Sequence, residues 1–188
     1  KEIIIKAKDF SNVCDIVGDR AEVIVSEVYE TEAYENVLVD NAVNVYDTGI
    51  FDSSNFEYQG EGTVVAVLDT GLDYYHTAFA TSNFHADRAN LGMTLQDVQA
   101  VINDTVASTM QSGLTAEDVY ISEKVPYAFD YADGDSDVYP LYSNHGTHVA
   151  GVIAGNDDVI TGVAPEAQLA IFKIFSDTDA QARASWIL

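Results

Sequence analysis

Two short apolar runs constrain the fold of this 188-residue chain more than any other feature. Residues 63–68 read TVVAVL and residues 169–175 read LAIFKIF, and neither run shows a strict alternation of polar and apolar residues. Strands that are buried on both faces have this continuous pattern, which is typical of parallel sheets covered by helices. Because segments with helical spacing lie between the two runs, the sequence predicts an α/β fold with a mostly parallel sheet.

Helical segments are predicted between and after these runs. Thr94 and Asp97 are spaced as a capping box at a helix start. Apolar residues then follow at helical spacing: Leu95, Val98, Val101, Ile102 and Val106. A second short helix is expected from Thr115, and the small residues of 145–154 predict a third. We also expect residues 180–188 to begin a further helix.

Composition limits the classes of partner. The chain has 31 acidic and 8 basic residues, and this net charge of −23 argues against binding to nucleic acid or to anionic lipid. A mean hydropathy near zero, with 11 Tyr and 8 Phe, argues for a folded chain rather than a disordered one. Cys14 is the single cysteine, which excludes an internal disulfide. Since no run approaches the roughly 18 apolar residues of a membrane span, we expect no membrane insertion.

Two polar residues occupy positions that often carry chemistry in α/β proteins. Asp69 follows the first apolar run, in VAVLDTGLD, at the carboxyl end of a predicted strand. An aspartate at such a position also commonly only caps the next turn. His145 opens the small-residue helix in SNHGTHVAGVIAG, where a lone histidine is often structural. His145 and His148 have an i, i+3 spacing rather than the HExxH spacing of zinc peptidases, so zinc is not expected.

The segments are much more specific together than singly. In order along the chain, VAVLDTGLD, SNHGTHVAGVIAG and GVAPEAQLAIFKIF resemble the subtilisin-like serine endopeptidases, or subtilases, from about Gly60 to the end. Within that family, DYADGDSDVYP, SNHGTHVAG and DVITGVAPEAQLAIFKIFSD look most like the cell-envelope proteinases of Gram-positive bacteria, of the lactocepin and C5a-peptidase type. The resemblance implies a subtilisin-like three-layer sandwich with a mostly parallel sheet, of which only the N-terminal half is expected here.

The resemblance also implies roles for single residues. Asp69 would orient the imidazole of His145, His145 would be the general base, and His148 would match the family's second, non-catalytic histidine, a structural residue. The family's Gly-Thr-Ser nucleophile segment does not occur in the 188 residues. We therefore expect a complementary C-terminal segment to supply the Ser, this chain alone to be inactive, and no cofactor to be required. Proteins or peptides would be the substrates, and the location would be extracellular, secreted or attached to the cell wall.

Two regions are predicted along the chain. Residues 1–40, with short strands at 1–10 and 22–29, resemble the C-terminal part of a subtilase propeptide or form an N-terminal extension. Propeptide cleavage would fall within residues 30–47. Residues 41–188 would form the N-terminal half of the peptidase domain.

An insertion is predicted at about residues 84–125. The two candidate catalytic residues are 76 positions apart, which is longer than in compact subtilases. The inserted element would lie beside the substrate cleft and either select substrates or only decorate the surface.

Structural calcium is left open by the sequence. Three aspartates alternate within an acidic loop at residues 130–137: Asp133, Asp135 and Asp137. The Gly and Glu that an EF-hand loop requires are replaced by Val138 and Asn144. Residues 155–162 are where many subtilases bind calcium, and this segment is shorter than usual. No calcium ligand is therefore assigned.

Two other functions remain as alternatives. Asp-Thr-Gly occurs at 47–49 and 69–71, as in aspartic proteases, but two triplets only 22 residues apart cannot serve two lobes, and the α/β pattern is wrong for that all-β fold. The second alternative is a catalytically inactive subtilase-like module that binds or regulates. The sequence of the Ser-bearing segment distinguishes this module from a protease.

Overall fold

The structure is a computed structural model that describes residues 59–178 and 180–182. The strands predicted at 1–10 and 22–29, and the proposed boundary near residue 40, lie outside these residues. The two predicted regions 1–40 and 41–188 therefore stay predictions. Within the described part, no helix is long and apolar enough to cross a membrane.

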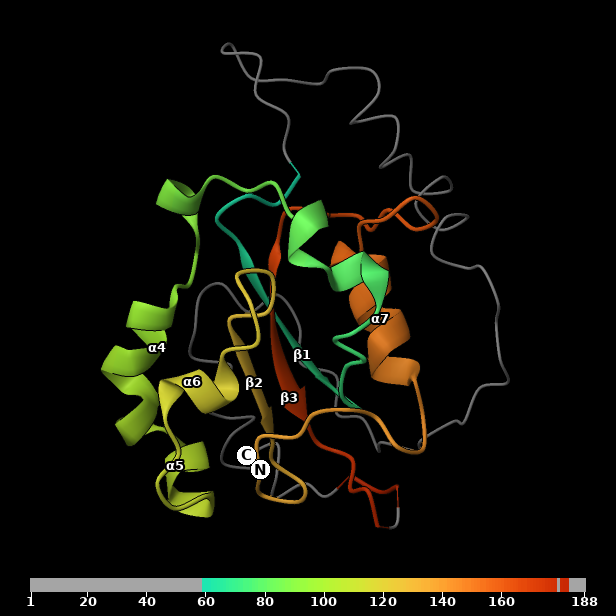
Figure 1. The fold of residues 1–188 in the computed structure, drawn as a ribbon. Helices are drawn as coiled ribbons and strands as arrows, with labels where there is room; N and C mark the ends of the chain where they lie inside the picture. The colour runs from blue at the N-terminus through green and yellow to red at the C-terminus, as the bar shows by residue number, and fades with distance from the viewer. Residues whose placement is uncertain (1–58, 179, 183–188) are drawn as a thin grey trace, which may run out of the picture. The chain divides into compact units, whose positions relative to one another are not determined.

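A three-stranded parallel sheet forms the centre of the described part (Figure 1). Strand β1 spans Val64–Asp69, β2 spans Tyr127–Asp130 and β3 spans Gln168–Lys173, in the order β1-β3-β2. The two apolar runs thus form the two strands that the sequence predicts. Strand β2 was not predicted, because a run of only four residues carries too weak a pattern. The α/β fold with a parallel sheet is confirmed.

Helices cover both faces of this sheet. Helix α7, His145–Ala154, packs against β1 and β3 on one face, as predicted for these small residues. Three short helices lie on the other face: α4 (Leu95–Val101), α5 (Val106–Met110) and α6 (Ala116–Val119). Four short 3-10 turns complete the elements: η1 (Thr77–Phe79), η2 (Thr81–Asn83), η3 (Arg88–Asn90) and η4 (Ile102–Asp104).

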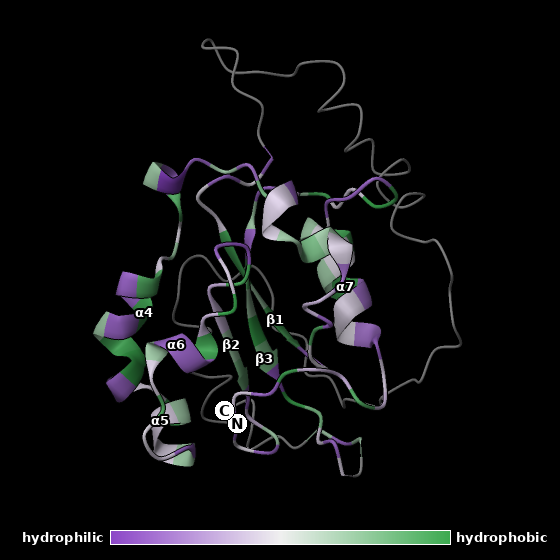
Figure 2. Cartoon of the chain, viewed as in Figure 1, coloured by the Kyte–Doolittle hydropathy of each residue, from purple (hydrophilic) through white to green (hydrophobic). Residues whose placement is uncertain are grey.

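Each face of the sheet has its own apolar cluster. Leu169 and Ile171 of β3 join Ala150 and Ala154 of α7 in one cluster. Ala170, between them in sequence, points to the opposite cluster, which contains the buried residues of α4, η4, α5 and α6. In Figure 2, β1 and β3 are largely hydrophobic, whereas α4 and α6 expose many hydrophilic residues. Because both faces are buried, the strands carry continuous apolar sequence.

The helix predicted over residues 94–106 is broken in the structure. Its capping box forms as predicted, with Thr94 and Asp97 exchanging hydrogen bonds. Helix α4 then ends at Val101, a 3-10 turn follows, and α5 begins at Val106. The side chain of Thr105 accepts a hydrogen bond from the N–H of Ser108 and so caps a new helix. The apolar spacing thus predicted helical structure correctly, but the cap at Thr105, which divides the segment into two helices, was not predicted.

The helix predicted from residue 180 is wrong over the described residues 180–182. Ala180 has a left-handed backbone with φ of 54°, and Ala182 forms a β-bridge with Phe175. These two features exclude a right-handed helical turn at the start of this segment.

The segment predicted as an insertion contributes buried residues to the core. Val98, Ile102, Ala107 and Val119 pack with Phe129 of β2. The helices of this segment therefore stabilise the sheet rather than only decorating the surface. They lie across the sheet from α7, which opens with His145, and their predicted location beside the substrate cleft stays a prediction.

Candidate active site

Asp69 and His145 meet at the carboxyl end of the sheet. Asp69 is the last residue of β1 and His145 is the first residue of α7. The imidazole Nδ1 lies 2.8 Å from Oδ1 and 2.9 Å from Oδ2 of Asp69. The Asp69 side chain is 14% exposed and the His145 side chain is 56% exposed. The two residues that the sequence selected, 76 positions apart, are therefore brought into direct contact.

This contact favours one tautomer of His145. A carboxylate that faces Nδ1 accepts a hydrogen bond, so the ring proton resides on Nδ1 and Nε2 keeps its lone pair. No described residue forms a hydrogen bond with Nε2. An imidazole held in this way can accept a proton from a hydroxyl at Nε2, while Asp69 stabilises the cation that results.

Thr70 ties the two segments of the site together. Its hydroxyl donates to the carbonyl oxygen of Ser143 at 2.8 Å and accepts from the N–H of Gly146 at 2.9 Å. Its own N–H donates to Oδ1 of Asp69 at 2.7 Å. The residue after Asp69 therefore orients the carboxylate and also fixes the first turn of α7.

Two glycines allow the close approach of these segments. A Cβ atom on Gly146 would lie 2.3 Å from the carbonyl oxygen of Gly71 and 3.1 Å from Cβ of Asp69. Gly71 has a φ of 106°, and a Cβ atom there would lie 2.2 Å from the carbonyl oxygen of Val138. Since any larger side chain would push the backbones apart, both positions require glycine.

A buried ion pair lies in the same row of the sheet as Asp69. Asp69, Lys173 and Asp130 are aligned across the three strands. Nζ of Lys173 lies 2.7 Å from Asp130 and 2.6 Å from Asp177, and the Lys173 and Asp130 side chains are each 1% exposed. Burial raises the pKa of the Asp130 carboxyl, which Lys173 partly offsets. Burial opposes the charge on Lys173, but the two carboxylates raise its pKa above the ordinary value.

Two carboxylates that contact Lys173 also belong to a possible calcium site. Among the described residues, one group of acidic side chains lies close enough together to hold a metal ion: Asp130, Asp133 and Asp177. The ammonium of Lys173 already contacts two of these carboxylates. Asp133 accepts hydrogen bonds from the Ser176 hydroxyl and the Asp177 N–H. The group therefore carries its own cation and does not fit calcium.

The alternating aspartates of the 130–137 loop do not converge. Asp135 accepts a hydrogen bond from the N–H of Asp137, and Asp137 accepts one from the N–H of Tyr139. Asp133 instead turns toward Ser176. Asp135 and Asp137 thus each cap their own turn, whereas Asp133 bonds to the segment after β3. The i, i+2, i+4 spacing, to which the sequence analysis assigned no calcium ligand, does not bring the three carboxylates together.

Protein donors also occupy one of the two carboxylates of the 155–162 segment, that of Asp157. Oδ1 of Asp157 accepts from the N–H groups of Val159 and Ile160, both at 2.8 Å. Oδ2 accepts from the Thr77 hydroxyl at 2.7 Å. Burial opposes ionisation of Asp157, but these hydrogen bonds lower its pKa. Since both oxygens are used within the protein, Asp157 does not fit a calcium ligand either.

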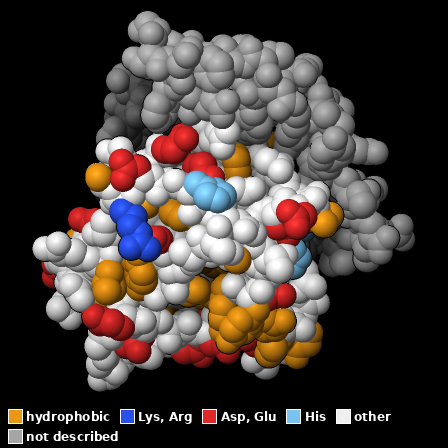
Figure 3. Space-filling model, turned by 45° about the horizontal axis from the view of Figure 1, so that its top comes forward, with side chains coloured by type: hydrophobic (Ala, Val, Ile, Leu, Met, Phe, Trp, Pro, Cys, Tyr) orange, Lys and Arg blue, Asp and Glu red, His pale blue; other side chains and the backbone are white. Residues whose placement is uncertain are grey.

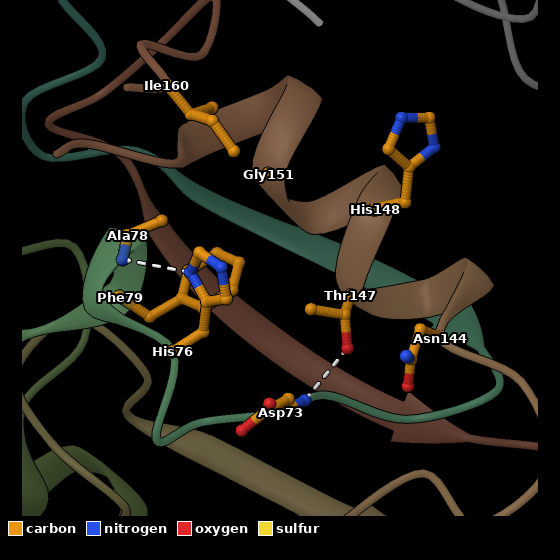
Figure 4. Close-up of a pocket in the computed structure, with 9 residues that line it drawn as sticks. All are labelled: Asp73, His76, Ala78, Phe79, Asn144, Thr147, His148, Gly151 and Ile160. Atoms are coloured by element: carbon orange, nitrogen blue, oxygen red, sulfur yellow. Dashed lines mark hydrogen bonds between the residues drawn. The ribbon is translucent and has the colours of Figure 1, made fainter. Parts of the chain in front are cut away.

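A pocket of about 250 Å³ lies between α7 and the segment that follows β1 (Figure 4). Its polar part is formed by Asp73, His76, Asn144, Thr147 and His148. The hydroxyl of Thr147 accepts from the N–H of Asp73 at 2.8 Å, which joins the turn after β1 to α7. His148 is exposed in this pocket, so its exposure does not support the expectation of a structural residue.

The pocket histidines do not form a metal site. Nδ1 of His76 accepts the N–H of Ala78 at 3.1 Å. In Figure 4 the His76 ring comes from the segment before η1 and the His148 ring comes from α7, and the two rings lie apart. His145, the other histidine of α7, faces Asp69. The expectation that His145 and His148 bind no zinc stays a prediction.

On the face drawn in Figure 3, Asp and Glu side chains are scattered among uncharged ones, and Lys or Arg is visible at one place. Of the three basic residues of the described part, Lys124 and Lys173 are buried, and Arg88 is exposed and paired with Glu123 at 3.0 Å. Few fixed positive charges therefore face solvent near the candidate site, where they would repel a cationic ligand.

A carboxylate–imidazole pair at the carboxyl edge of a parallel sheet, held by close-packed glycines, is the arrangement expected for two of the three members of a serine-peptidase triad. Residues 60–187 match the model of the subtilase family, peptidase S8. This chain belongs to that family, which confirms the resemblance drawn from its motifs.

Curated relatives are similar to nearly the whole chain. The PII-type proteinase of Lacticaseibacillus paracasei and the PI-type proteinase of Lactococcus lactis subsp. cremoris are each 33% identical over 186 residues, covering 95% of this chain. The C5a peptidase of Streptococcus pyogenes is 32% identical over 124 residues, or 62% of this chain. The matched region is 9% of each of these relatives' own length.

Sequence reasoning missed several residues that hold the site. Thr70, Gly71 and Gly146 lie inside the quoted motifs, so their position was a usable signal. The sequence signal for Lys173 was weaker: it is a single charged residue inside an apolar run that predicts a buried strand. A lysine at such a position indicates a buried counter-ion, because an unpaired buried charge is very costly.

Proposed function

We propose that this chain is the part of a serine endopeptidase that carries the acid and the base of an Asp-His-Ser triad. The contact of His145 Nδ1 with both oxygens of Asp69, at 2.8 and 2.9 Å, is the observation that carries this proposal. Membership of the subtilase family supports the same reaction class. The substrates would be proteins or peptides.

In the proposed reaction, a serine hydroxyl attacks the scissile carbonyl carbon and gives its proton to Nε2 of His145. The imidazolium formed is stabilised by Asp69 through the Nδ1–H hydrogen bond. The same proton then passes from Nε2 to the leaving amine as the peptide C–N bond breaks. Water hydrolyses the acyl-serine ester by the reverse sequence of proton transfers, with His145 again as base.

A further segment of polypeptide would supply the serine, because Gly-Thr-Ser does not occur in the 188 residues. Strand β1 supports this proposal. It pairs with β3 on one side, and no other described strand pairs with its second edge. Leu68, next to Asp69 in this strand, is 45% exposed. An apolar strand with an open edge favours pairing with another strand, and a strand there would lie next to the catalytic acid.

The proposed location is extracellular or at the cell wall. Similarity to the PI- and PII-type proteinases and the C5a peptidase supports it. The scarcity of cysteine, with Cys14 as the single example, is compatible with a secreted bacterial protein.

Labelling with a fluorophosphonate tests the proposed function. The protein that contains residues 1–188 together with its Ser-bearing segment is treated with the reagent and analysed by denaturing mass spectrometry. We expect the label on a serine of that segment, and we expect His145→Ala to slow labelling by about a thousandfold or more, because the base is lost.

His148→Ala is the matched control, since His148 lies one turn further along α7 and does not contact Asp69. It should label at the wild-type rate. Labelling that is independent of His145, or absent from the wild-type protein, would overturn the proposal. Absence of labelling would favour the inactive binding module.

A further inference from the structure

Three tyrosine rings from two separate segments form a cluster near the candidate dyad. Tyr74 and Tyr75 lie in the turn that follows β1, and Tyr139 lies in the loop that leads to α7. The ring centroids are 4.5 Å apart for Tyr74–Tyr75, 6.2 Å for Tyr74–Tyr139 and 6.3 Å for Tyr75–Tyr139. Tyr75 is 78% exposed and Tyr139 is 37% exposed. In this tyrosine cluster, Tyr74 is partly buried and packs against the core, so it anchors the cluster, whereas Tyr75 and Tyr139 present ring surface to solvent.

Backbone contacts fix the tyrosine cluster with respect to His145. The N–H of Leu72 donates to the carbonyl oxygen of Val138 at 2.9 Å, which joins the two tyrosine-bearing segments. The N–H of Asp73 donates to the hydroxyl of Thr147 in α7 at 2.8 Å. The same short segments that hold Asp69 and His145 together thus also hold the cluster beside them.

Two carboxylates flank the rings. Oδ1 of Asp73 accepts the N–H of Tyr75 at 3.1 Å, and Oδ1 of Asp137 accepts the N–H of Tyr139 at 3.0 Å. Among the described residues, no hydrogen-bond donor reaches the Oδ2 atom of either carboxylate. One oxygen of each group therefore builds the cluster and the other stays available to a ligand.

The electrostatic field at the cluster is negative. A hydrogen bond with Tyr75, then burial, and then the charges of Asp137 and Asp73 among others raise the pKa of Tyr74 to about 12. The groups that act on Tyr74 all raise its pKa, and none of the three basic residues of the described part, Arg88, Lys124 and Lys173, is among them. Aromatic faces with adjacent carboxylates are the surroundings that organic cations prefer.

We propose that the tyrosine cluster and its two carboxylates form a subsite that binds an arginine or lysine side chain of the polypeptide substrate. This inference rests on the proposed function in so far as the bound peptide is the substrate. A guanidinium group would stack on a tyrosine face and direct its N–H groups to the free carboxylate oxygens. An apolar side chain would instead remove water from two carboxylates without a counter-charge, which is unfavourable.

Peptide binding to the 188-residue chain tests the subsite without any hydrolysis. The probes are acetyl-Ala-Arg-Ala-amide and the same peptide with citrulline, which has nearly the shape of arginine but no charge. Affinities are measured by chemical-shift titration. We expect the arginine peptide to bind about fivefold more tightly or better at low salt. This preference should shrink strongly near 0.5 M salt, because screening weakens exposed charge interactions.

Three variants locate the binding. Tyr75→Ala should reduce the preference for arginine, and so should Asp73→Asn, which keeps the oxygen that accepts the Tyr75 N–H. Tyr142→Ala is the matched control, since Tyr142 is 65% exposed in the same loop as Tyr139 but is not in the cluster. Equal affinities for the two peptides would overturn the proposal, as would an equal loss in Tyr142→Ala and Tyr75→Ala.

These outcomes are separate from the test of the proposed function. If the chain prefers the arginine peptide but the serine of the complementary segment is never labelled, the proposed subsite is supported and the proposed protease function is overturned. If labelling requires His145 but the two peptides bind equally, the proposed protease function is supported and the proposed subsite is overturned.

Discussion

The backbone of Gly146 rests against the backbone of Gly71, so that a Cβ atom on Gly146 would lie 2.3 Å from the Gly71 carbonyl oxygen. One glycine follows His145 and the other lies two residues after Asp69. The contact between the two catalytic candidates therefore depends on the absence of a side chain at position 146.

Gly146→Ala should separate these segments. We expect the free energy of unfolding to fall by about 1–3 kcal/mol, because the added methyl group meets backbone atoms that cannot move independently. The measurement is urea unfolding of the chain. Gly151→Ala in the same helix is the control, since a Cβ atom there meets no other atom within 4 Å. It should be neutral or raise stability by up to about 1 kcal/mol, as is usual for Gly to Ala in a helix. Equal losses in both variants would contradict the account.

Asp130→Asn should strongly destabilise the fold. The asparagine oxygen can still accept the N–H groups of Ala132 and Asp133, which now bond to Oδ1 of Asp130. The ammonium of Lys173 would nevertheless lose its buried partner, and breaking a buried ion pair on one side costs about 3–5 kcal/mol. Chemical denaturation at neutral pH measures the loss. Asp177→Asn, whose side chain is 28% exposed, should cost much less. A smaller loss for Asp130→Asn than for Asp177→Asn would show that the buried pair does not hold this end of the sheet.

Lys124 should make stability rise with pH above neutrality. Lys124 is 1% exposed, and its ammonium donates to the carbonyl oxygens of Pro165 and Ala167. Burial lowers its pKa from 10.5 to about 8, although Glu166 opposes the shift. Between these two values the unfolded chain binds more protons than the folded one, so the free energy of unfolding increases with pH.

The contribution of Lys124 is measured as the difference between the wild-type chain and Lys124→Met. This difference in unfolding free energy should grow in favour of the wild type from pH 8 to pH 10.5, by up to about 3 kcal/mol. The neutral amine still has N–H groups for both carbonyls, so no hydrogen bond is lost on titration. Parallel stability curves for the two proteins would show that Lys124 stays protonated in the folded state.

The sequence was sufficient to predict those strands and helices whose residue pattern is long or uninterrupted. The continuous apolar runs identified β1 and β3, and the small residues after His145 identified α7. It was insufficient where a local hydrogen bond decides the outcome, as at Thr105, whose side chain starts α5 within an uninterrupted helical pattern. Strand β2 has only four residues and takes its position from pairing with β3, which no local pattern encodes.

The candidate site was predictable in its two principal residues and not in their surroundings. Asp69 and His145 stand in motifs specific enough to identify, and the structure brings them into contact. The neighbours of that contact come from distant segments: Lys173 joins Asp130 through the alignment of three strands, and Tyr74 joins Tyr139 through a turn against a loop. Such pairs depend on tertiary structure and cannot be read from a local pattern. For this reason the aspartates of the acidic loop have the spacing of a cation site in the sequence, whereas in the structure two of them cap turns and Asp130 pairs with Lys173.

The most direct test of the account is the tautomer of His145, measured by nitrogen-15 NMR of the histidine side chains in the 188-residue chain at a pH where the ring is neutral. We predict that the proton resides on Nδ1 and that Nε2 is unprotonated, because Asp69 lies 2.8 Å from Nδ1. In Asp69→Asn the amide can donate to Nδ1, and the proton should move to Nε2, which abolishes the base. A wild-type ring protonated mainly on Nε2, or a tautomer unchanged by Asp69→Asn, would contradict the assignment of these two residues as the acid and base of the triad.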